Sequence, residues 1–202
     1  MARAILKPVL PLALACLATT AMAQLEVEKW QRYTSQTLKV SFESLGEPVE
    51  EVIEWTGKLA ELTEKTIGVA FNSGDAELSL FRLTAKAGLV LTPKETLALR
   101  LAVAKEKAPD FKIEQEKEAL DSDFPYVYAW VKYTGPEGEP VSRRLMVVGQ
   151  GTDQWLLEAT GLGPQNARDA AARFFGSLWM DQEGKVRPGD PKKGGGGQAA
   201  RP

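Results

Sequence analysis

The sequence predicts an α+β fold in which helices pack mainly on one face of a single antiparallel, twisted sheet. Alternating apolar segments are joined by short clusters of Gly, Pro, Asn and Asp, and such short links favour antiparallel neighbours over crossover connections. In two further segments the apolar residues recur at the 3.6-residue period of a helix instead of the two-residue period of a strand. The resulting order of strands, helix, strands and helix is typical of α+β architecture.

The start of the chain has the pattern of a secretory signal peptide. Arg3 and Lys7 supply a positive region, residues 8–22 are uncharged, and the A-x-A motif at residues 21–23 is a cleavage site. The apolar run is too short for a membrane span of about 20 residues, and no later run approaches that length. We therefore expect cleavage after Ala23, a periplasmic or secreted protein, and no integral membrane segment in the mature chain.

The remaining sequence divides into one folded region and one tail. Residues 24–181 are enough for a single α+β domain with its own apolar core. Residues 182–202 have almost no apolar content and are rich in Gly, Pro and Lys, which predicts a disordered tail. Cys16 is the one cysteine, and Ala13 stands where a lipoprotein signal usually carries leucine, so lipidation of Cys16 is the less favoured interpretation.

The first elements expected within the domain are strands. Residues 38–42 alternate between apolar and polar side chains, and residues 30–33 can form a short strand before them. Two more alternating runs, at 67–71 and 78–83, flank the turn sequence Asn-Ser-Gly-Asp at 72–75. This arrangement predicts a β-hairpin.

Residues 49–64 form the ambiguous part of the sequence. Their apolar residues have approximately helical spacing, but Gly57 interrupts that pattern, so we favour strand-rich structure here. Trp55 lies in this least regular segment. Of the five tryptophans it is therefore the one that we expect to be exposed and available to a ligand or partner.

A helix is predicted from Thr92 to Pro109. Thr92 suits the N-cap, and Glu95 three residues later completes a capping box. The main apolar stripe of this helix consists of Leu97, Leu101, Ala104 and Ala108. Leu99 and Val103 project almost opposite to it. This second strip is either covered by a neighbouring loop or presented to a partner.

The C-terminal part of the domain has the most consistent pattern. Strands are predicted at residues 111–118, 125–134, 140–148 and 155–160, and a helix follows Pro164. Phe174 lies on the apolar stripe of that helix, so we expect it to be part of the core. Arg143 and Arg144 stand early in their strand near a hairpin turn, where charged side chains are usually solvated.

The order of these elements, with LKVSF at 38–42 and AARFFGSLW at 171–179, resembles the PsbP-like and DcrB-like group of small secreted domains. The resemblance covers residues 30–180. It implies a role like that of the group, which includes accessory subunits of photosynthetic complexes, envelope proteins and chaperone-like binders of apolar protein segments. The group has no shared catalytic motif, so the resemblance implies no functional residues.

Several chemistries are excluded by composition. The chain has no histidine, and its cysteine lies in the expected signal peptide, which removes Ser-His-Asp and Cys-His catalysis and zinc sites built from His or Cys. Charges of both signs are interspersed, with a formal net charge of −2, unlike the basic footprint of a nucleic-acid binder. Asp121 and Asp123 could serve a carboxylate hydrolase, but an Asp-Ser-Asp loop is typical of a solvated turn. We expect no enzyme activity, no cofactor and no metal site.

The leading functional hypothesis is a non-enzymatic binding or accessory module that contacts another envelope protein, whose identity the sequence does not reveal. Leu99, Val103 and Trp55 are the candidate partner-binding residues. The alternative is a carrier of a small apolar ligand or lipid, enclosed between the sheet and the helices. A hydrolase that uses Asp121 and Asp123 is the third hypothesis.

Overall fold

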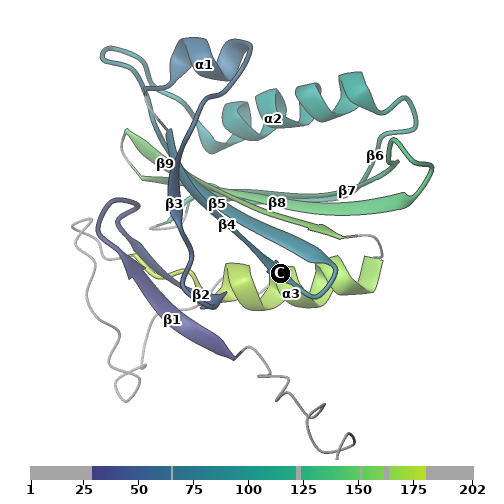
Figure 1. The fold of residues 1–202 in the computed structure, drawn as a ribbon. Helices are drawn as coiled ribbons and strands as arrows, with labels where there is room; N and C mark the ends of the chain where they lie inside the picture. Colours follow the sequence, from purple (N-terminus) through teal and green to yellow (C-terminus); the bar gives the residue numbers. More distant parts are fainter. Residues whose placement is uncertain (1–28, 65, 122–123, 151, 162–163, 181–202) are drawn as a thin grey trace, which may run out of the picture.

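The computed structural model describes residues 29–64, 66–121, 124–150, 152–161 and 164–180. Their centre is a seven-stranded antiparallel sheet in the order β3-β4-β5-β9-β8-β7-β6, accompanied by a separate two-stranded sheet of β1 and β2 (Figure 1). The expected signal peptide at 1–23 and the expected tail at 182–202 lie outside the described residues.

The strands, in chain order, are β1 (Trp30–Ser35), β2 (Val40–Leu45), β3 (Glu50–Ile53), β4 (Thr66–Ser73), β5 (Ala76–Thr84), β6 (Lys112–Ala119), β7 (Tyr126–Thr134), β8 (Pro140–Gln150) and β9 (Asp153–Gly161). The helices are α1 (Lys58–Leu62), α2 (Pro93–Lys107) and α3 (Pro164–Ser177). The α+β class and a large antiparallel sheet are therefore confirmed, whereas the expectation of a single sheet is wrong because β1 and β2 form a second one.

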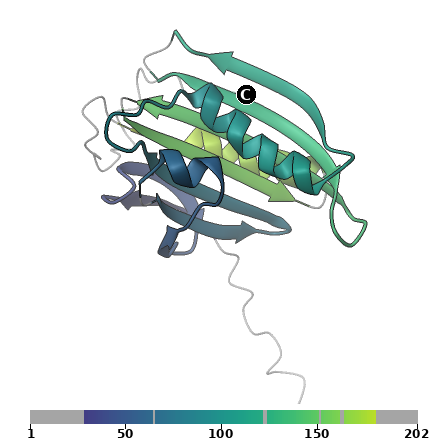
Figure 2. The same ribbon diagram turned by 90° about the horizontal axis from the view of Figure 1, so that it is seen from above.

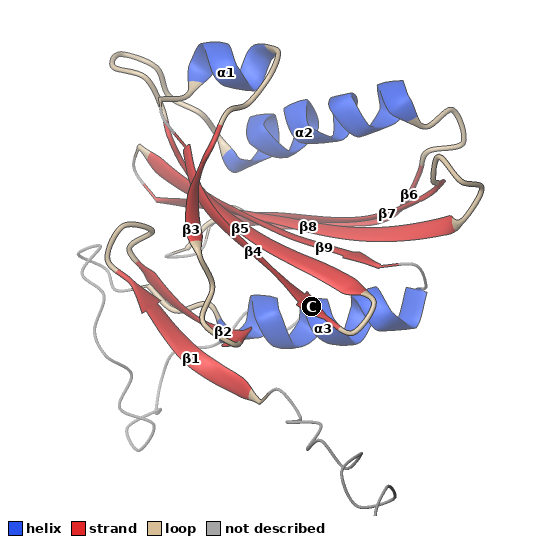
Figure 3. Cartoon of the chain, viewed as in Figure 1, coloured by secondary structure: helices blue, strands red, loops and turns tan. Residues whose placement is uncertain are grey.

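The helices lie on both faces of the large sheet, which corrects the expectation of one main face. Figure 3 shows α1 and α2 on one side, and α3 with the β1–β2 pair on the other. Successive side chains of a strand point to opposite faces, so Leu145 packs in the cluster under α2 while Met146 packs in the cluster under α3. The central strands are apolar on both faces, and each face needs its own cover.

The core on the α3 side is rich in aromatic rings. Phe174 is fully buried, as predicted, and its ring centroid lies 5.9 Å from that of Phe42 and 5.3 Å from that of Phe71. The backbone of Trp179, just after α3, exchanges two hydrogen bonds with Ser41 on β2, of 2.8 and 3.0 Å. The small β1–β2 sheet is thus joined to the end of the last helix.

The predicted capping box of α2 is present. The Glu95 amide donates to the Thr92 hydroxyl at 3.2 Å, and the Thr92 amide donates to the Glu95 carboxylate at 2.9 Å. Leu97 and Leu101 are buried against the sheet, as the main stripe predicted. The local sequence therefore specifies both the start of α2 and its inner face.

The ambiguous region combines a strand and a helix. Glu50–Ile53 forms β3, but the residues after Gly57 form the short helix α1, so the expectation of strand alone is wrong for that half. Gly57 has a positive φ of 65° and stands at the N-cap of α1, a conformation that costs glycine little. The hairpin predicted around residues 72–75 is confirmed as β4–β5.

Candidate binding surface beside helix α2

A buried carboxylate anchors α2 to the sheet. Glu158 on β9 is 5% exposed, and its Oε1 accepts a hydrogen bond from Arg100 Nε of α2 at 2.6 Å. Arg100 Nη2 reaches the other oxygen at 3.1 Å, and Arg143 of β8 forms a second ion pair with that oxygen. Both oxygens of Glu158 are therefore occupied by guanidinium groups.

These contacts keep Glu158 ionised in a place that would otherwise favour the neutral acid. Burial by itself would raise the pKa of Glu158, but the charge of Arg143 and the hydrogen bond from Arg100 hold the pKa below its ordinary value. The Arg143 guanidinium is also desolvated, which would lower its pKa, yet the Glu158 charge raises it above the usual range. A carboxylate held in this way serves structure better than proton transfer.

Arg143 and Arg144 are both largely buried, which corrects the expectation that they are solvated. Arg143 points to the α2 face and pairs with Glu158, whereas Arg144 points to the α3 face and is 7% exposed. The sequence showed a charged pair near a turn. It did not show that β8 lies in the interior of the sheet, where both faces are covered.

Trp55 lies against the same anchor. The Arg100 Cζ atom is 5.0 Å from the centre of the Trp55 ring, and the Phe81 ring centroid is 5.2 Å away. The Trp55 Nε1 donates to Thr66 Oγ1 at 2.8 Å, which fixes the orientation of the indole. Trp55 is half-buried, so the expectation that it is the exposed tryptophan is wrong; Trp179, at 37%, is more exposed.

Phe81 can lie under Trp55 because the neighbouring strand carries a glycine. Gly68 of β4 stands directly opposite Phe81 of β5, and a Cβ on Gly68 would lie 2.5 Å from the Phe81 ring. The close approach therefore requires glycine. The Phe81 ring meets the Trp55 indole edge to face, at an interplanar angle of 70°, beside the helix.

Leu99 and Val103 are half-buried on one flank of α2. Thr96 and Arg100, one turn apart, hold the β9 side of the helix through Gln154 and Glu158. By helical geometry, Leu99 and Val103 lie on the same flank but farther from the sheet. We call Trp55, Phe81, Leu99 and Val103 the α2 flank; Figure 2 shows α2 along the middle of the sheet with α1 beside it.

The strongest apolar exposure near this flank was missed from the sequence. Val90 is 80% exposed and Leu89 is 39% exposed in the loop between β5 and α2. The loop is held at both ends: the Lys86 amide donates to the carbonyl of Leu62 in α1, and the Leu91 carbonyl accepts a hydrogen bond from Gln154. The signal was visible as three consecutive apolar residues just before the N-cap, where no strand or helix required them.

Two clefts lie at the hairpin end of the large sheet. The larger one, of about 510 Å³, is lined by Asp75, Glu77 and Glu139 among other residues, and the smaller one, of about 260 Å³, by Asp110, Lys112 and Lys132 among others. The lining of the larger cleft mixes polar and apolar surface, whereas that of the smaller cleft is mostly apolar although three charged residues border it.

The other sequence candidates are not assembled into a reactive site. Asp121 is exposed, and Asp123 lies outside the described residues. Within the ranges that the structure describes, no three acidic, histidine or cysteine residues are grouped so that they could hold a metal ion. In the same ranges, no helix has both the length and the apolar character needed to span a membrane.

Comparisons with known proteins support the fold. No family model matches the chain, and no curated protein matches it either. The solution structure of cyanobacterial PsbP (CyanoP) from Synechocystis sp. PCC 6803 superposes with a TM-score of 0.54 and 8% identity, covering 81% of this chain and 99% of that one. The fold is PsbP-like.

A second solved structure is less similar. It is PA94 from Pseudomonas aeruginosa, a protein of unknown function, with a TM-score of 0.38, 13% identity, and coverage of 69% of this chain and 87% of that one. The PsbP-like part of the resemblance seen in the sequence is thus confirmed for the fold, while its DcrB-like part stays a prediction. At such low identity, the similarity concerns architecture and not activity.

Proposed function

We propose that this chain is a non-enzymatic accessory module that binds another protein through the α2 flank and the adjoining loop at Leu89 and Val90. The observation that carries the proposal is the exposure of Val90, 80%, in the loop that leads into α2, a helix whose flank carries the half-buried Leu99 and Val103. Exposed apolar side chains that adjoin one another mark protein interaction surfaces, and Leu89 and Val90 are exposed at consecutive positions. The signal-peptide pattern supports a partner in the cell envelope or outside the cell.

The surface is also pre-organised. Arg100 is fixed by Glu158, Trp55 is fixed by Thr66, and the loop is tied to α1 and β9. A partner that docks here does not have to order these groups first, so less conformational entropy is lost on binding. The ion pairs therefore support the binding surface.

The alternative function, a carrier of a small apolar ligand, has less support. The two clefts described above are open to solvent and are bordered by charged residues, and the sheet faces under α2 and α3 are filled by two apolar clusters. An apolar ligand in the larger cleft would displace water from the charged Glu77 and Glu139, which is unfavourable.

The proposal is tested by photo-crosslinking from single positions. The photoreactive residue benzoylphenylalanine replaces Val90 in one variant and Val103 in a second. The matched control is Gln36, an exposed residue in the β1–β2 turn on the other side of the sheet. Each full-length variant is expressed in the original host and irradiated in intact cells, and adducts are identified by mass spectrometry.

We expect the same protein adduct from positions 90 and 103 and none from position 36, because a typical interface of about 800 Å² per partner spans both positions. Identical adducts from all three positions, or no adduct from 90 and 103, would refute the proposal. Native mass spectra with an added few hundred daltons would instead support the carrier.

A further inference from the structure

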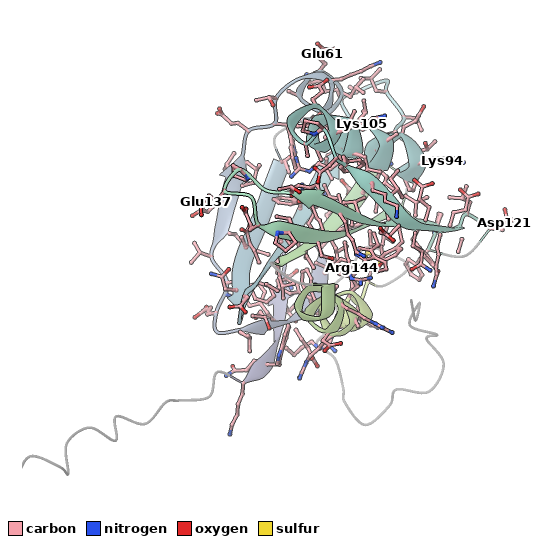
Figure 4. All side chains as sticks on the ribbon, turned by 90° about the vertical axis from the view of Figure 1, so that its right-hand side faces the viewer. Glu61, Lys94, Lys105, Asp121, Glu137 and Arg144 are labelled. Carbon is pink, nitrogen blue, oxygen red and sulfur yellow. The ribbon has the colours of Figure 1, made fainter. Side chains whose placement is uncertain are left out.

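A second surface lies on the opposite side of the sheet, where β6, β7 and β8 face α3. We call it the cationic face and define it by Lys112, Lys117, Trp130, Lys132 and Arg144. Helix α3 packs mainly on β9, β8, β2 and β5, which leaves the β6–β7 side of this face open. Figure 4 shows Arg144 next to α3, whereas Lys94 and Lys105 lie on α2 across the sheet.

The strand register gathers positive charge on this face. Lys112 stands directly opposite Lys132, and Lys117 stands opposite Tyr128. Two acids of β6 point the other way. Glu116 stands opposite Ala129 and Glu118 opposite Val127, and the Glu118 carboxylate lies 3.3 Å from Lys94 of α2. Like charges placed opposite each other destabilise a sheet, so this separation of charge has an energetic cost.

One carboxylate partly offsets that charge. Glu114, at the bulge in β6, lies 3.0 Å from Lys112 and 3.8 Å from Lys132. It serves two lysines at once, and its pKa is lowered by the hydrogen bond from Lys112. The face keeps a local excess of positive charge although the whole chain has a net charge of −2.

Two of the cations lie against the ring of Trp130. Lys132 Nζ is 4.6 Å and Arg144 Cζ is 4.3 Å from the ring centroid, within the range of cation–π contact. The indole Nε1 donates to Ser142 Oγ at 2.9 Å, so the ring is held in place. Trp130 thus contacts two positive groups of this face.

Arg144 is the deepest of these cations and lacks a counter-charge in the described part of the chain. Its Nη1 donates to the neutral Tyr128 hydroxyl at 2.6 Å, and its buried Nε has no hydrogen-bond acceptor. Arg143, its neighbour on the other face of the sheet, forms an ion pair with Glu158. A buried cation without an anion is costly, and its uncompensated charge adds to the positive potential of the face above it.

We propose that the cationic face docks an acidic, extended peptide segment of a partner protein. Its carboxylates would lie along Lys112, Lys117 and Lys132, whose side chains reach the solvent, with Arg144 buried beneath them. The charge complementarity is the argument for this occupant. A single-stranded nucleic acid fits less well because bases would compete with two cations for the Trp130 ring. This surface is separate from the α2 flank, so either proposal can fail alone.

The test uses a fluorescein-labelled hexaglutamate peptide and the full-length chain, with fluorescence anisotropy as the readout at low ionic strength. The key variant is Lys132→Glu, because the Lys132 side chain is 38% exposed and belongs to neither apolar cluster. The matched control is Lys105→Glu, which makes the same charge change on the exposed side of α2 (Figure 4). A third variant, Lys117→Glu, checks the outer part of the face. Circular dichroism confirms that each variant is folded.

We expect Lys132→Glu and Lys117→Glu each to weaken binding by about tenfold or more, Lys105→Glu to change it by less than about twofold, and added salt to weaken it. Absence of binding to the unmodified chain, or equal weakening by Lys105→Glu, would overturn the proposal. Tighter binding of a ten-residue oligothymidylate would assign the face to nucleic acid instead. Displacement of the peptide by an equal concentration of inorganic phosphate would reduce it to a small-anion site.

Discussion

The two helical layers of this protein are held to the same sheet by different forces. Under α3 the contacts are apolar and largely aromatic, with Phe174 surrounded by Phe42, Phe71 and Phe175. Under α2 a smaller apolar stripe is supplemented by buried polar contacts, from Arg100 to Glu158 and from Thr96 to Gln154.

This difference explains where each layer can offer a surface. The apolar residues of α3 pack in the core. Helix α2 obtains part of its attachment from ion pairs and hydrogen bonds, so some of its apolar residues, Leu99 and Val103, remain on the flank. The layer anchored by polar contacts is therefore the one that we propose for partner binding.

The largest expected effect is in the aromatic layer. Phe174→Ala should lower the free energy of unfolding by about 3–5 kcal/mol, because it removes a fully buried ring and leaves a cavity. Leu101→Ala in the α2 layer should cost about 2–3 kcal/mol, since Leu101 is smaller and 8% exposed. Urea denaturation followed by tryptophan fluorescence measures both. Equal losses of unfolding free energy in Phe174→Ala and Leu101→Ala would contradict the proposed difference in packing between the two layers.

The second prediction concerns the ionic anchor. Glu158→Gln should cost about 3 kcal/mol, because two buried guanidinium groups lose their counter-charge. The control is Glu118→Gln, which removes the exposed pair with Lys94 and should change the stability by less than about 0.5 kcal/mol. If Glu158→Gln and Glu118→Gln changed the free energy of unfolding equally in urea denaturation, the buried ion pairs would not contribute to the attachment of α2.

The same carboxylate gives a pH dependence of known sign. The pKa of Glu158 is lowered in the folded protein, so the unfolded state takes up its proton first on acidification. Its contribution to stability is complete above the ordinary pKa of 4.5 and is lost as the pH falls toward the lower folded pKa. Below pH 4.5 the unmodified chain should therefore lose stability more steeply than Glu158→Gln, as measured by urea midpoints across pH.

A smaller effect is expected at the start of α2. Thr92→Ala removes the hydroxyl that accepts the hydrogen bond from the Glu95 amide and should lower the free energy of unfolding by about 1 kcal/mol. Thr92→Ser keeps the hydroxyl and should lower it much less. Amide hydrogen exchange in the first turn of α2 reports the change locally. Unchanged exchange in Thr92→Ala would show that packing alone holds this end of the helix.

The smallest effect is expected in the exposed loop. Val90→Ser should alter stability by no more than about 0.5 kcal/mol, because the side chain is 80% exposed. The thermal unfolding midpoint should stay constant while the proposed partner is lost in a pull-down from host envelope extracts. A clear loss of stability would mean that Val90 belongs to the core and not to a binding surface.

Some of this fold was predictable from short stretches of sequence. The capping box at Thr92 and Glu95, the β4–β5 hairpin and the strands from β7 to β9 depend on neighbours close in the chain. The burial of Phe174 followed from helical periodicity alone. These features need no knowledge of which strand lies beside which.

The parts of the candidate site were harder to predict because their partners are distant in sequence. Arg100 meets Glu158 across 58 residues, and Arg143 meets it across the β8–β9 pair. Nothing near Arg143 indicated a buried acid. The segment around Trp55 and Gly57 was mispredicted in part because a five-residue helix has too few turns to show a period.

The sequence by itself determined an α+β class, the hairpins, both long helices, the absence of histidine chemistry and the resemblance to PsbP-like domains. Only the tertiary structure decided the strand order, the opposite sides for α2 and α3, and the burial of two adjacent arginines. The physical reason is that periodicity shows which side chains share a face, while the pairing of distant strands decides what covers it.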